Sequence, residues 1–355
     1  MLNVKERTKK EILSYLEEKE GKIYEKQEGS AYQGYLKEWY DEESGRTYLI
    51  DIRMTDLDMV IYRVLPGIHV ADKAYIPAVA KYFQDLECEL GILSVSRDYP
   101  DVVYRTQMCM KEVAITKVAL EIVEEEAIGI FRKHFVNIEK LAHGKMVGIL
   151  RRRRKSQKPK KVESVSYDKK GNYEKLEEYL TKISRHNEVC KNLNEKSECV
   201  YSCQVVAERN RFRLQYNLTD NGFLVIKAFH GEKGLVIREE YKYGVADCMN
   251  DKNARYDYGS LHIGDEKDGV YCCIHTPIHG GVIGVETIRI MERIVLLILN
   301  EVIGAIEHLS VGIMPRIREE VVEAIVSEAL TYVKRPGMRA AEGKKIVNIA
   351  DVIGK

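Results

Sequence analysis

The sequence predicts an α+β protein built from two tandem modules. Each module is ordered as helix, three strands, helix, two strands and helix, and a further helix follows at the C-terminus. Residues 91–141 align with residues 259–309 at a constant offset of 168 without a gap, and 10 of the 51 aligned positions are identical. Segments with alternating apolar residues predict antiparallel strands, and apolar residues spaced three and four apart predict helices. A repeat this long indicates two copies of a whole small domain.

The first elements of the two copies are a helix and a three-stranded meander. One face of each opening helix collects the apolar residues Ile12, Tyr15 and Leu16 in the first copy and Tyr173, Leu176, Tyr179, Leu180 and Ile183 in the second. The alternating strand residues are Tyr48, Ile50, Ile52 and Met54 in the first copy and Phe212, Leu214, Tyr216 and Leu218 in the second. Hairpin turns are expected at residues 41–45 and 220–222, which are rich in Asp, Asn and Gly. Third strands are predicted at 60–65 and 224–229.

The remaining elements of each copy are a helix, two strands and a long closing helix. The second helices are predicted at 73–86 and 240–251, and the closing helices at about 112–141 and 281–309. The paired strands are predicted at 92–95, 102–108, 261–263 and 270–274. The closing helix of the second copy is apolar nearly all round, so we expect it to be covered on more than one side. In the first copy Glu124, Glu125 and Glu126 interrupt the apolar pattern, so we expect that helix to be more exposed.

The predicted boundaries are residues 1–142 for the first module, 143–171 for a linker, 172–310 for the second module, and 311–355 for a C-terminal helix and tail. Eight of the eleven residues 151–161 are positively charged, and Pro159 blocks a regular helix, which predicts a mobile or extended connector. Residues 315–332 predict an amphipathic helix with Ile317, Val321, Ile325 and Ala329 on one face.

Composition indicates an ordinary globular protein, since 45% of the residues are hydrophobic and 31% are charged. A net charge of +1 argues against a field over the whole molecule that would steer nucleic acid. The longest apolar run, residues 294–299, is far shorter than the ~20 residues of a membrane span. The N-terminus lacks the apolar core of a secretory signal. We therefore expect a cytoplasmic protein with no transmembrane segment, whose cysteines stay reduced.

Residues 243–309 resemble the YbjN-like family of bacterial proteins, which has the type III secretion chaperone-like fold. The resemblance lies in a helix that ends with Asn250 and Asn253, the run Gly-Ser-Leu-His-Ile-Gly at 259–264, an acidic turn at 265–269, a strand at 270–274 and the long closing helix. The first copy joins the family through its likeness to the second. The family implies no catalytic residues. It implies a protein-binding or regulatory role, and the related chaperones hold an extended partner segment as dimers, which a tandem pair would imitate.

The strongest metal-ligand candidates are Cys273, His275 and His279. Zinc requires converging thiolates and imidazoles. On a strand, however, Cys272 and Cys273 point to opposite faces, which leaves only Cys273 and His275 on one side. Two ligands are too few, so strand packing is the favoured interpretation and we expect neither a metal nor a cofactor.

The predicted function is that of a non-enzymatic protein-interaction or chaperone-like regulatory protein that binds a partner segment on its sheet and helix surfaces. The sequence has no nucleophile–base motif and no paired-carboxylate motif. Candidate partner-surface residues are Trp39, Tyr40, Tyr241 and Tyr243, because such aromatic residues suit interfaces. Half-buried sheet edges explain them equally well.

An electrostatic adaptor is the alternative function. The candidate anion-binding residues are Arg151, Arg152, Arg153, Arg154, Lys155, Lys158, Lys160 and Lys161. Such a run would bind the phosphates of nucleic acid or an anionic membrane, whereas the competing interpretation is a solvated connector. The two modules are expected to pack as an internal pseudo-dimer, and a further homodimer is left open.

Overall fold

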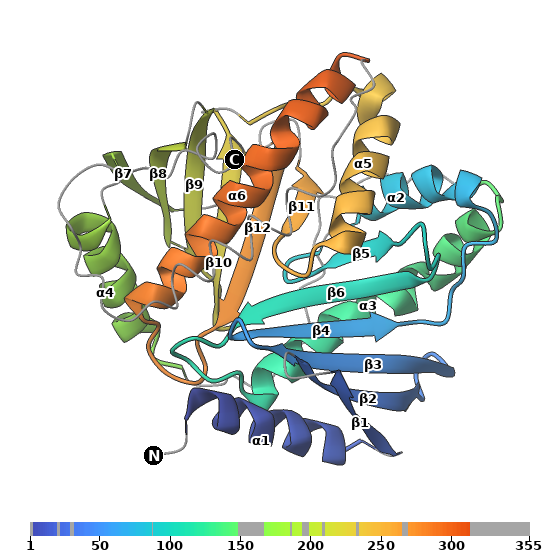
Figure 1. Cartoon of the computed structure of the whole chain (residues 1–355), viewed down its shortest axis with the longest axis horizontal. Coiled ribbons are helices and arrows are strands. Elements are labelled where there is room, and N and C mark those ends of the chain that lie inside the picture. Colours follow the sequence, from blue (N-terminus) through green and yellow to red (C-terminus); the bar gives the residue numbers. More distant parts are fainter. Residues whose placement is uncertain are drawn as a thin grey trace, which may run out of the picture.

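The computed structural model describes residues 3–19, 22–28, 32–86, 88–147, 167–184, 187–193, 199–207, 210–231, 234–264 and 269–312. The chain is an α+β protein (Figure 1). The elements of its first half are α1 (Val4–Glu17), β1 (Ile23–Glu28), β2 (Tyr32–Asp41), β3 (Arg46–Thr55), β4 (Met59–Leu65), η1 (Lys73–Tyr75), α2 (Ile76–Gln84), β5 (Ile92–Val95), β6 (Val102–Cys109) and α3 (Lys117–Ala142). Those of its second half are α4 (Lys169–Glu178), η2 (Tyr179–Ile183), β7 (Asn187–Leu193), β8 (Cys199–Ala207), β9 (Asn210–Leu218), β10 (Phe223–His230), η3 (Glu239–Tyr241), α5 (Lys242–Arg255), β11 (Ser260–Ile263), β12 (Val270–Pro277) and α6 (Val285–Ser310).

One sheet of 12 strands runs through both halves, in the order β1-β2-β3-β4-β6-β12-β10-β9-β8-β7. β5 pairs with β6, and β11 pairs with β12. Neighbouring strands are antiparallel except at the junction between the halves, where β6 and β12 meet as parallel strands through the single pair Met108 and His275. From this junction β6 and β12 diverge, and β5 and β11 lie between them (Figure 1).

The long helices cover opposite faces of the sheet. In Figure 1, α3 lies behind β4 and β6, whereas α6 lies in front of β10 and β12. Each helix closes an apolar core with the strands of its own half, and the two cores exchange side chains at the junction. Met59 and Cys109 from the first half belong to the core of the second, and Phe223 and Val225 belong to the core of the first. The halves therefore bury apolar surface in each other as well as pairing strands.

Most predicted elements are present at their expected places, including the turn between β2 and β3 and the turn between β9 and β10. The meander differs from the prediction because each half has four strands before its second helix, where three were expected. The additional strands, β1 and β7, are the outermost in the sheet. Their sequences, IYEKQE and NEVCKNL, are largely polar. An outer strand needs little apolar surface, so no clear alternation marked these two segments.

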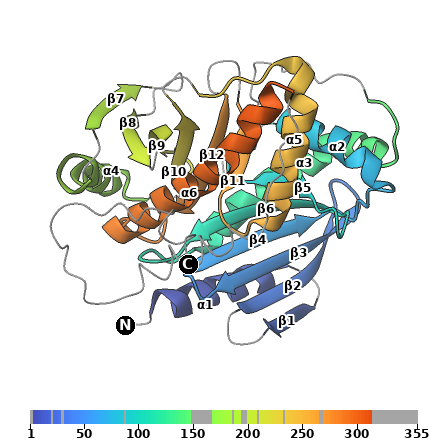
Figure 2. The ribbon, with the colours of Figure 1, turned by 45° about the horizontal axis from the view of Figure 1, so that its top comes forward.

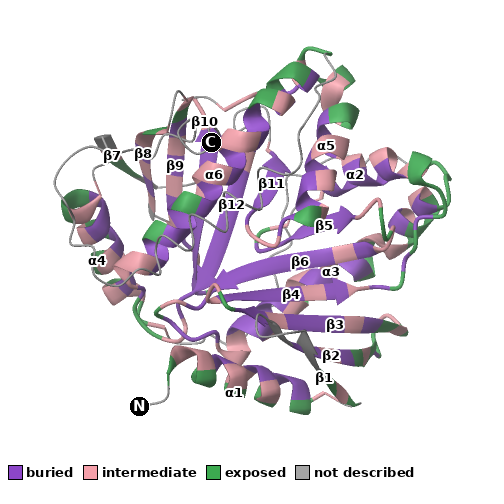
Figure 3. Cartoon of the chain, viewed as in Figure 1, coloured by how far each residue is buried: buried purple, intermediate pink, exposed green. Residues whose placement is uncertain are grey.

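The helix α6 is covered on more than one side, as its composition predicted (Figure 3). Ile288, Met291 and Val295 belong to the second core. Ile290 and Ile294, which lie on other faces of the helix, are only 3% and 2% exposed. At the start of the helix, the backbone N–H and the hydroxyl of Thr287 both donate to Glu112 of the first half at 2.9 Å. Among the described helices, none combines the length and apolar character that a membrane crossing requires.

The three consecutive glutamates of α3 do not form the exposed interruption that was expected. Glu124 accepts hydrogen bonds from the hydroxyls of Tyr15 and Tyr62, and its other carboxylate oxygen accepts one from Lys19 at 2.7 Å. Glu126 accepts the Tyr104 hydroxyl at 2.8 Å and the Leu90 backbone N–H at 3.0 Å. Glu125 alone of the three is exposed. The expectation was wrong because tyrosines on α1, β4 and β6 supply inward-facing partners.

Candidate partner-binding edge

The outer edge of the first half is stepped. β1 pairs with β2 from Ile23 opposite Lys37 to Glu28 opposite Tyr32. The last four residues of β2, Glu38 to Asp41, continue past β1 and pair only with β3. Within the part of the chain that the structure describes, the far side of β1 and this end of β2 have no neighbouring strand. An outer strand of this kind presents backbone donors and acceptors to another chain. We call β1 together with residues 38–41 of β2 the stepped edge.

Trp39 and Tyr40, two of the residues proposed from sequence, lie on the end of β2 that extends past β1. Trp39 is half-buried, its ring centroid is 6.0 Å from that of Tyr48, and the Lys19 ammonium lies 4.6 Å from its ring centroid. Tyr40 points to the opposite face and is 58% exposed. Tyr24 on β1 is 53% exposed. The stepped edge therefore combines open backbone with exposed aromatic side chains.

Lys37 fixes the inner corner of the step. Its side chain is buried, and its ammonium donates hydrogen bonds to the carbonyl oxygens of Leu16 and Lys19 at the end of α1. Burial lowers the pKa of Lys37, with the nearby charge of Lys19 acting in the same direction. These contacts hold β2 against α1 at the residue where β1 stops pairing, so the step is built into the fold.

The opposite outer strand, β7, is less suited to accept a partner. Its pairing with β8 is interrupted between Asn187 and Cys190, where the register shifts. Such irregularities twist an outer strand away from flat pairing and are a common protection against edge-to-edge association. The β1 pairing runs through six consecutive residue pairs without a shift.

Tyr241 and Tyr243, also proposed as partner-surface residues, lie at the start of α5, which is separated from β2 by much of the sheet (Figures 1 and 2). Tyr241 packs against the second core, whereas Tyr243 is 53% exposed. The Lys81 ammonium lies 5.2 Å from the ring centroid of Tyr243. The structure therefore does not bring the four proposed aromatic residues onto one surface.

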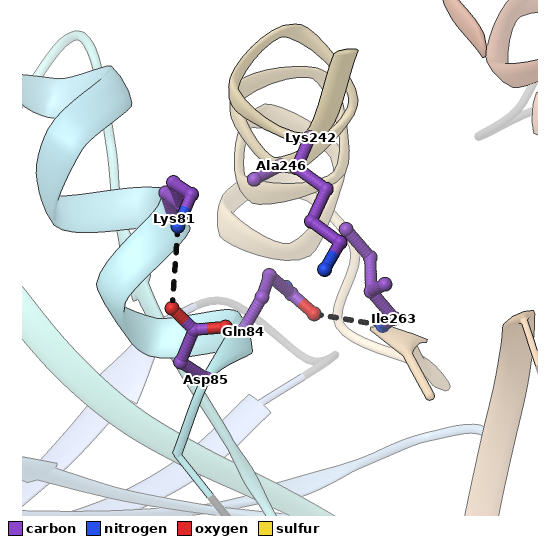
Figure 4. Close-up of a pocket in the computed structure, with 6 residues that line it drawn as sticks. All are labelled: Lys81, Gln84, Asp85, Lys242, Ala246 and Ile263. Atoms are coloured by element: carbon purple, nitrogen blue, oxygen red, sulfur yellow. Dashed lines mark hydrogen bonds and ion pairs between the residues drawn. The ribbon is translucent and has the colours of Figure 1, made fainter. Parts of the chain in front are cut away.

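A small depression lies beside Tyr243, between α2 and α5 (Figure 4). Its walls are Lys81, Gln84, Asp85, Lys242, Ala246 and Ile263. Lys81 forms an ion pair with Asp85 at 3.5 Å, and Gln84 accepts a hydrogen bond from the Ile263 backbone at 2.9 Å. The depression is small and its polar groups are partnered, so it is poorly suited to a small-molecule ligand.

The sequence-proposed metal ligands take part in separate contacts. Cys273 lies beside His262, with 3.3 Å between Sγ and Nε2, and both contact the Ser260 hydroxyl. His275 is hydrogen-bonded to Thr106, and the ring of His279 packs edge-on against Tyr167 and Phe223. Among the described residues, no group of three or more His, Cys, Asp and Glu side chains is arranged to hold a metal ion.

Burial keeps the Cys273–His262 pair uncharged. It lowers the pKa of His262 to about 3 and raises the pKa of the Cys273 thiol. The neutral thiol is a weak nucleophile compared with a thiolate. Sequence reasoning did not single out this pair, although Ser260 and His262 stand two residues apart and so share one face of β11.

The remaining sequence candidates, Arg151, Arg152, Arg153, Arg154, Lys155, Lys158, Lys160 and Lys161, lie outside the described residues.

The chain matches no family model and no curated protein. Among solved structures it is similar to the di-domain ARO/CYC StfQ from the steffimycin biosynthetic pathway, with 8% sequence identity. The similarity covers 92% of this chain and 95% of that one, with a TM-score of 0.17. A TM-score this low carries no argument about fold or function.

Proposed function

We propose that this chain is a non-enzymatic protein-interaction module that binds an extended segment of another protein at the stepped edge. The observation that carries the proposal is the regular outer strand β1, whose pairing with β2 stops at Ile23 opposite Lys37 and leaves residues 38–41 of β2 open beside it. A peptide that adds to such an edge gains affinity from main-chain hydrogen bonds and specificity from alternate side chains. The irregular pairing of β7 makes the other end of the sheet the weaker candidate.

Charge at the stepped edge favours a basic partner segment. Glu38 and Glu42 are exposed at or beside its open end. A strand that carries lysine or arginine at alternate positions would pair with these carboxylates, while its apolar residues would contact Tyr24 or Tyr40. We therefore expect an extended segment with both basic and apolar positions.

We further propose that the two halves are copies of one module and that the module is YbjN-like. Both halves run helix, four strands, helix, two strands and helix. Glu124 and Glu292, identical in the sequence alignment, each accept hydrogen bonds from two tyrosine hydroxyls, Tyr15 and Tyr62 in one half and Tyr179 and Tyr216 in the other. A common origin accounts for this agreement. The fourth strand is a departure from the three-stranded meander of the proposed family.

Photo-crosslinking in the native cells tests the stepped edge. Benzoylphenylalanine is introduced into the full-length chain at Tyr24 on β1 or, as the matched control, at the exposed Lys191 on β7. We expect one partner segment to be crosslinked from position 24 and not from position 191. Failure to crosslink any protein from position 24, or equal recovery from both positions, would contradict the proposal.

A synthetic peptide of the crosslinked segment is then titrated against Tyr24→Pro and Glu25→Pro. N–H groups alternate in direction along a strand, so one of these two prolines removes an outward donor. We expect that variant to bind roughly tenfold more weakly, the cost of one lost main-chain hydrogen bond. Unchanged binding by both variants, with an unchanged circular dichroism spectrum, would exclude strand addition at β1.

A further inference from the structure

Three half-buried apolar side chains form a row on the face of the first half that lies opposite α3. Leu49 on β3 pairs with Leu65 on β4. The antiparallel register of β4 and β6 places Val103 of β6 beside Leu65. Neighbours of this kind on paired strands share a face. We call Leu49, Leu65 and Val103 the apolar row, and Figure 1 shows α3 behind the strands that carry it.

The apolar row contributes to neither of the two cores formed by the described residues. Its three side chains are half-buried, and none belongs to a core or packs against one. The residues next to them along the same strands, Tyr48, Val64 and Tyr104, are completely buried in the first core under α3. Among the helices labelled in Figure 1, none lies in front of β3 and β4. Apolar side chains grouped on an open face mark a site of contact with another chain.

The row at the corresponding place in the second half is covered by its own neighbours. Phe229 of β10 pairs with Arg213 of β9 on one side and with Tyr271 of β12 on the other. The guanidinium of Arg213 lies 4.4 Å from the ring centroid of Phe229. The Lys227 ammonium lies 4.9 Å from the ring centroid of Tyr271. Phe229 is only 1% exposed, so the half-buried apolar row is a property of the first half.

The end of the apolar row nearest the stepped edge is acidic. Glu38 pairs with Leu49 across β2 and β3, and it therefore lies on the same face. Glu38 and Glu42 are exposed, and neither forms an ion pair with another described residue. Glu43, by contrast, pairs with Arg132 of α3. A partner that covers the row is therefore favoured by positive charge at this end.

The spacing of the row favours a helix over an extended segment as the occupant. Its three residues lie on neighbouring strands about 4.8 Å apart, so the row spans about 10 Å. A helix that crosses the strands presents apolar residues three and four positions apart at steps of roughly 5–6 Å, and residues seven positions apart are about 10.5 Å apart along its axis. Alternate residues of an extended segment are about 6.6 Å apart and would not match the strands.

We propose that the apolar row is the docking site for an amphipathic helix of a partner protein, with large aliphatic residues on the row and lysine or arginine beside Glu38 and Glu42. Helix α3 covers the other face of these strands, so the docked helix completes a three-layer arrangement of helix, sheet and helix. The docking site lies on side chains of the sheet face and uses no main-chain donor of the stepped edge. Strand addition at β1 can therefore fail while helix docking holds, and the reverse.

Binding of a synthetic peptide to the full-length chain tests the proposal. The probe is a fluorescent amphipathic peptide of leucine and lysine, about 18 residues long so that it forms a helix. Leu49→Gln together with Leu65→Gln should weaken its binding roughly tenfold, because the docked helix loses apolar contact. Val136→Gln is the matched control, since Val136 is 51% exposed on α3 behind the sheet. This control should leave binding unchanged.

The charge at the end of the row is tested with the same peptide. Glu38→Lys together with Glu42→Lys should weaken binding roughly fivefold, whereas Glu125→Lys, at an exposed position on α3, should not. Circular dichroism of each variant checks that the chain remains folded.

A second form of the peptide carries benzoylphenylalanine at one apolar position, so that mass spectrometry locates its contact on the chain. We expect links to β3, β4 or β6. The proposal is overturned if the links map elsewhere, if the row variants behave like their controls, or if the folded chain does not bind the peptide. It is also overturned if sedimentation shows that Leu49→Gln with Leu65→Gln dissociates a dimer, because a second copy of the chain would then occupy the row.

Discussion

Glu126 is a carboxyl group that folding moves into surroundings less polar than water. Burial raises its pKa from 4.5 to about 7, although the Tyr104 hydroxyl and the Leu90 N–H oppose the shift. The folded chain therefore holds this proton up to about pH 7, whereas the unfolded chain releases it near pH 4.5. Its contribution to stability is complete below about pH 4.5 and is lost as the pH rises to about 7.

The substitution Glu126→Gln should remove this pH dependence. At pH 5 the wild-type side chain is largely neutral, and the variant loses stability because its amide replaces one acceptor with a donor. At pH 8 the wild-type carboxylate is charged, so the difference in unfolding free energy should shrink by about 2–3 kcal/mol. Denaturant unfolding at both pH values measures it, with Glu125→Gln on the exposed side of α3 as the control. An equal difference at the two pH values would show that Glu126 does not titrate in this range.

The sequence alone did not show which glutamates of α3 would face inward. The alignment identified Glu124 and Glu292 as identical, but a run of three glutamates predicted only an exposed stretch. Which of them faces inward depends on the tyrosines of α1 and β4, distant in sequence from α3. Periodicity along one helix carries no information about such partners.

Each of the two long helices contains a glycine whose replacement should change the stability of the chain. Apart from the nearby backbone of their own helices, Gly129 in α3 and Gly304 in α6 have no heavy atom within 4 Å of the position that a Cβ would take. Gly129→Ala and Gly304→Ala should each raise the free energy of unfolding by about 0.5–1 kcal/mol, because alanine loses less backbone entropy in a helix. Thermal unfolding measures the gain.

Gly91, just before β5, provides the contrasting case. A Cβ there would lie 2.3 Å from the Tyr104 ring, so Gly91→Ala should destabilise the chain. If all three variants shifted the melting temperature in the same direction, the packing around these glycines would differ from the one described.

Strands and helices with a strong apolar pattern could be predicted, and those without one could not. Ile50 and Ile52 alternate with polar residues because one face of β3 packs on the core, and that strand was predicted correctly. β1 and β7 have no comparable pattern, so sequence reasoning missed the strand that now carries the stepped edge. Trp39 and Tyr40 were nevertheless proposed from their residue types alone, and they lie on the end of β2 that extends past β1.

At the scale of the whole molecule, each half supplies a side chain that binds the backbone of the other. Asn250 on α5 accepts from the N–H of Val95 and donates to its carbonyl oxygen, both at 2.9 Å, at the end of β5. Gln84 on α2 accepts from the N–H of Ile263 at the end of β11 at 2.9 Å. These contacts join residues 155 and 179 positions apart, which no local pattern could reveal.

Two asparagines of α5 allow this joint to be tested. Asn253 binds Leu261 in the second half with the same two-bond geometry that Asn250 uses on Val95 in the first. Asn250→Ala and Asn253→Ala should each cost about 2–4 kcal/mol, because each leaves two buried backbone groups unsatisfied. Hydrogen exchange distinguishes the two variants. Asn250→Ala should speed the exchange of the Val95 amide roughly tenfold, and Asn253→Ala should do the same for the Leu261 amide. Acceleration of both amides in both variants would mean that β5 and β11 open together.

The seam between β6 and β12 has a consequence for synthesis on the ribosome. Thr276 donates to the carbonyl oxygen of Cys109, 167 residues earlier in the sequence. This side of β6 therefore has no partner strand until nearly all of the second half has been synthesised. At common translation speeds the wait is roughly 8 to 33 s. During that interval a nascent chain exposes Met108 and Cys109 to its neighbours on the same message, and slow codons before β12 would lengthen the exposure.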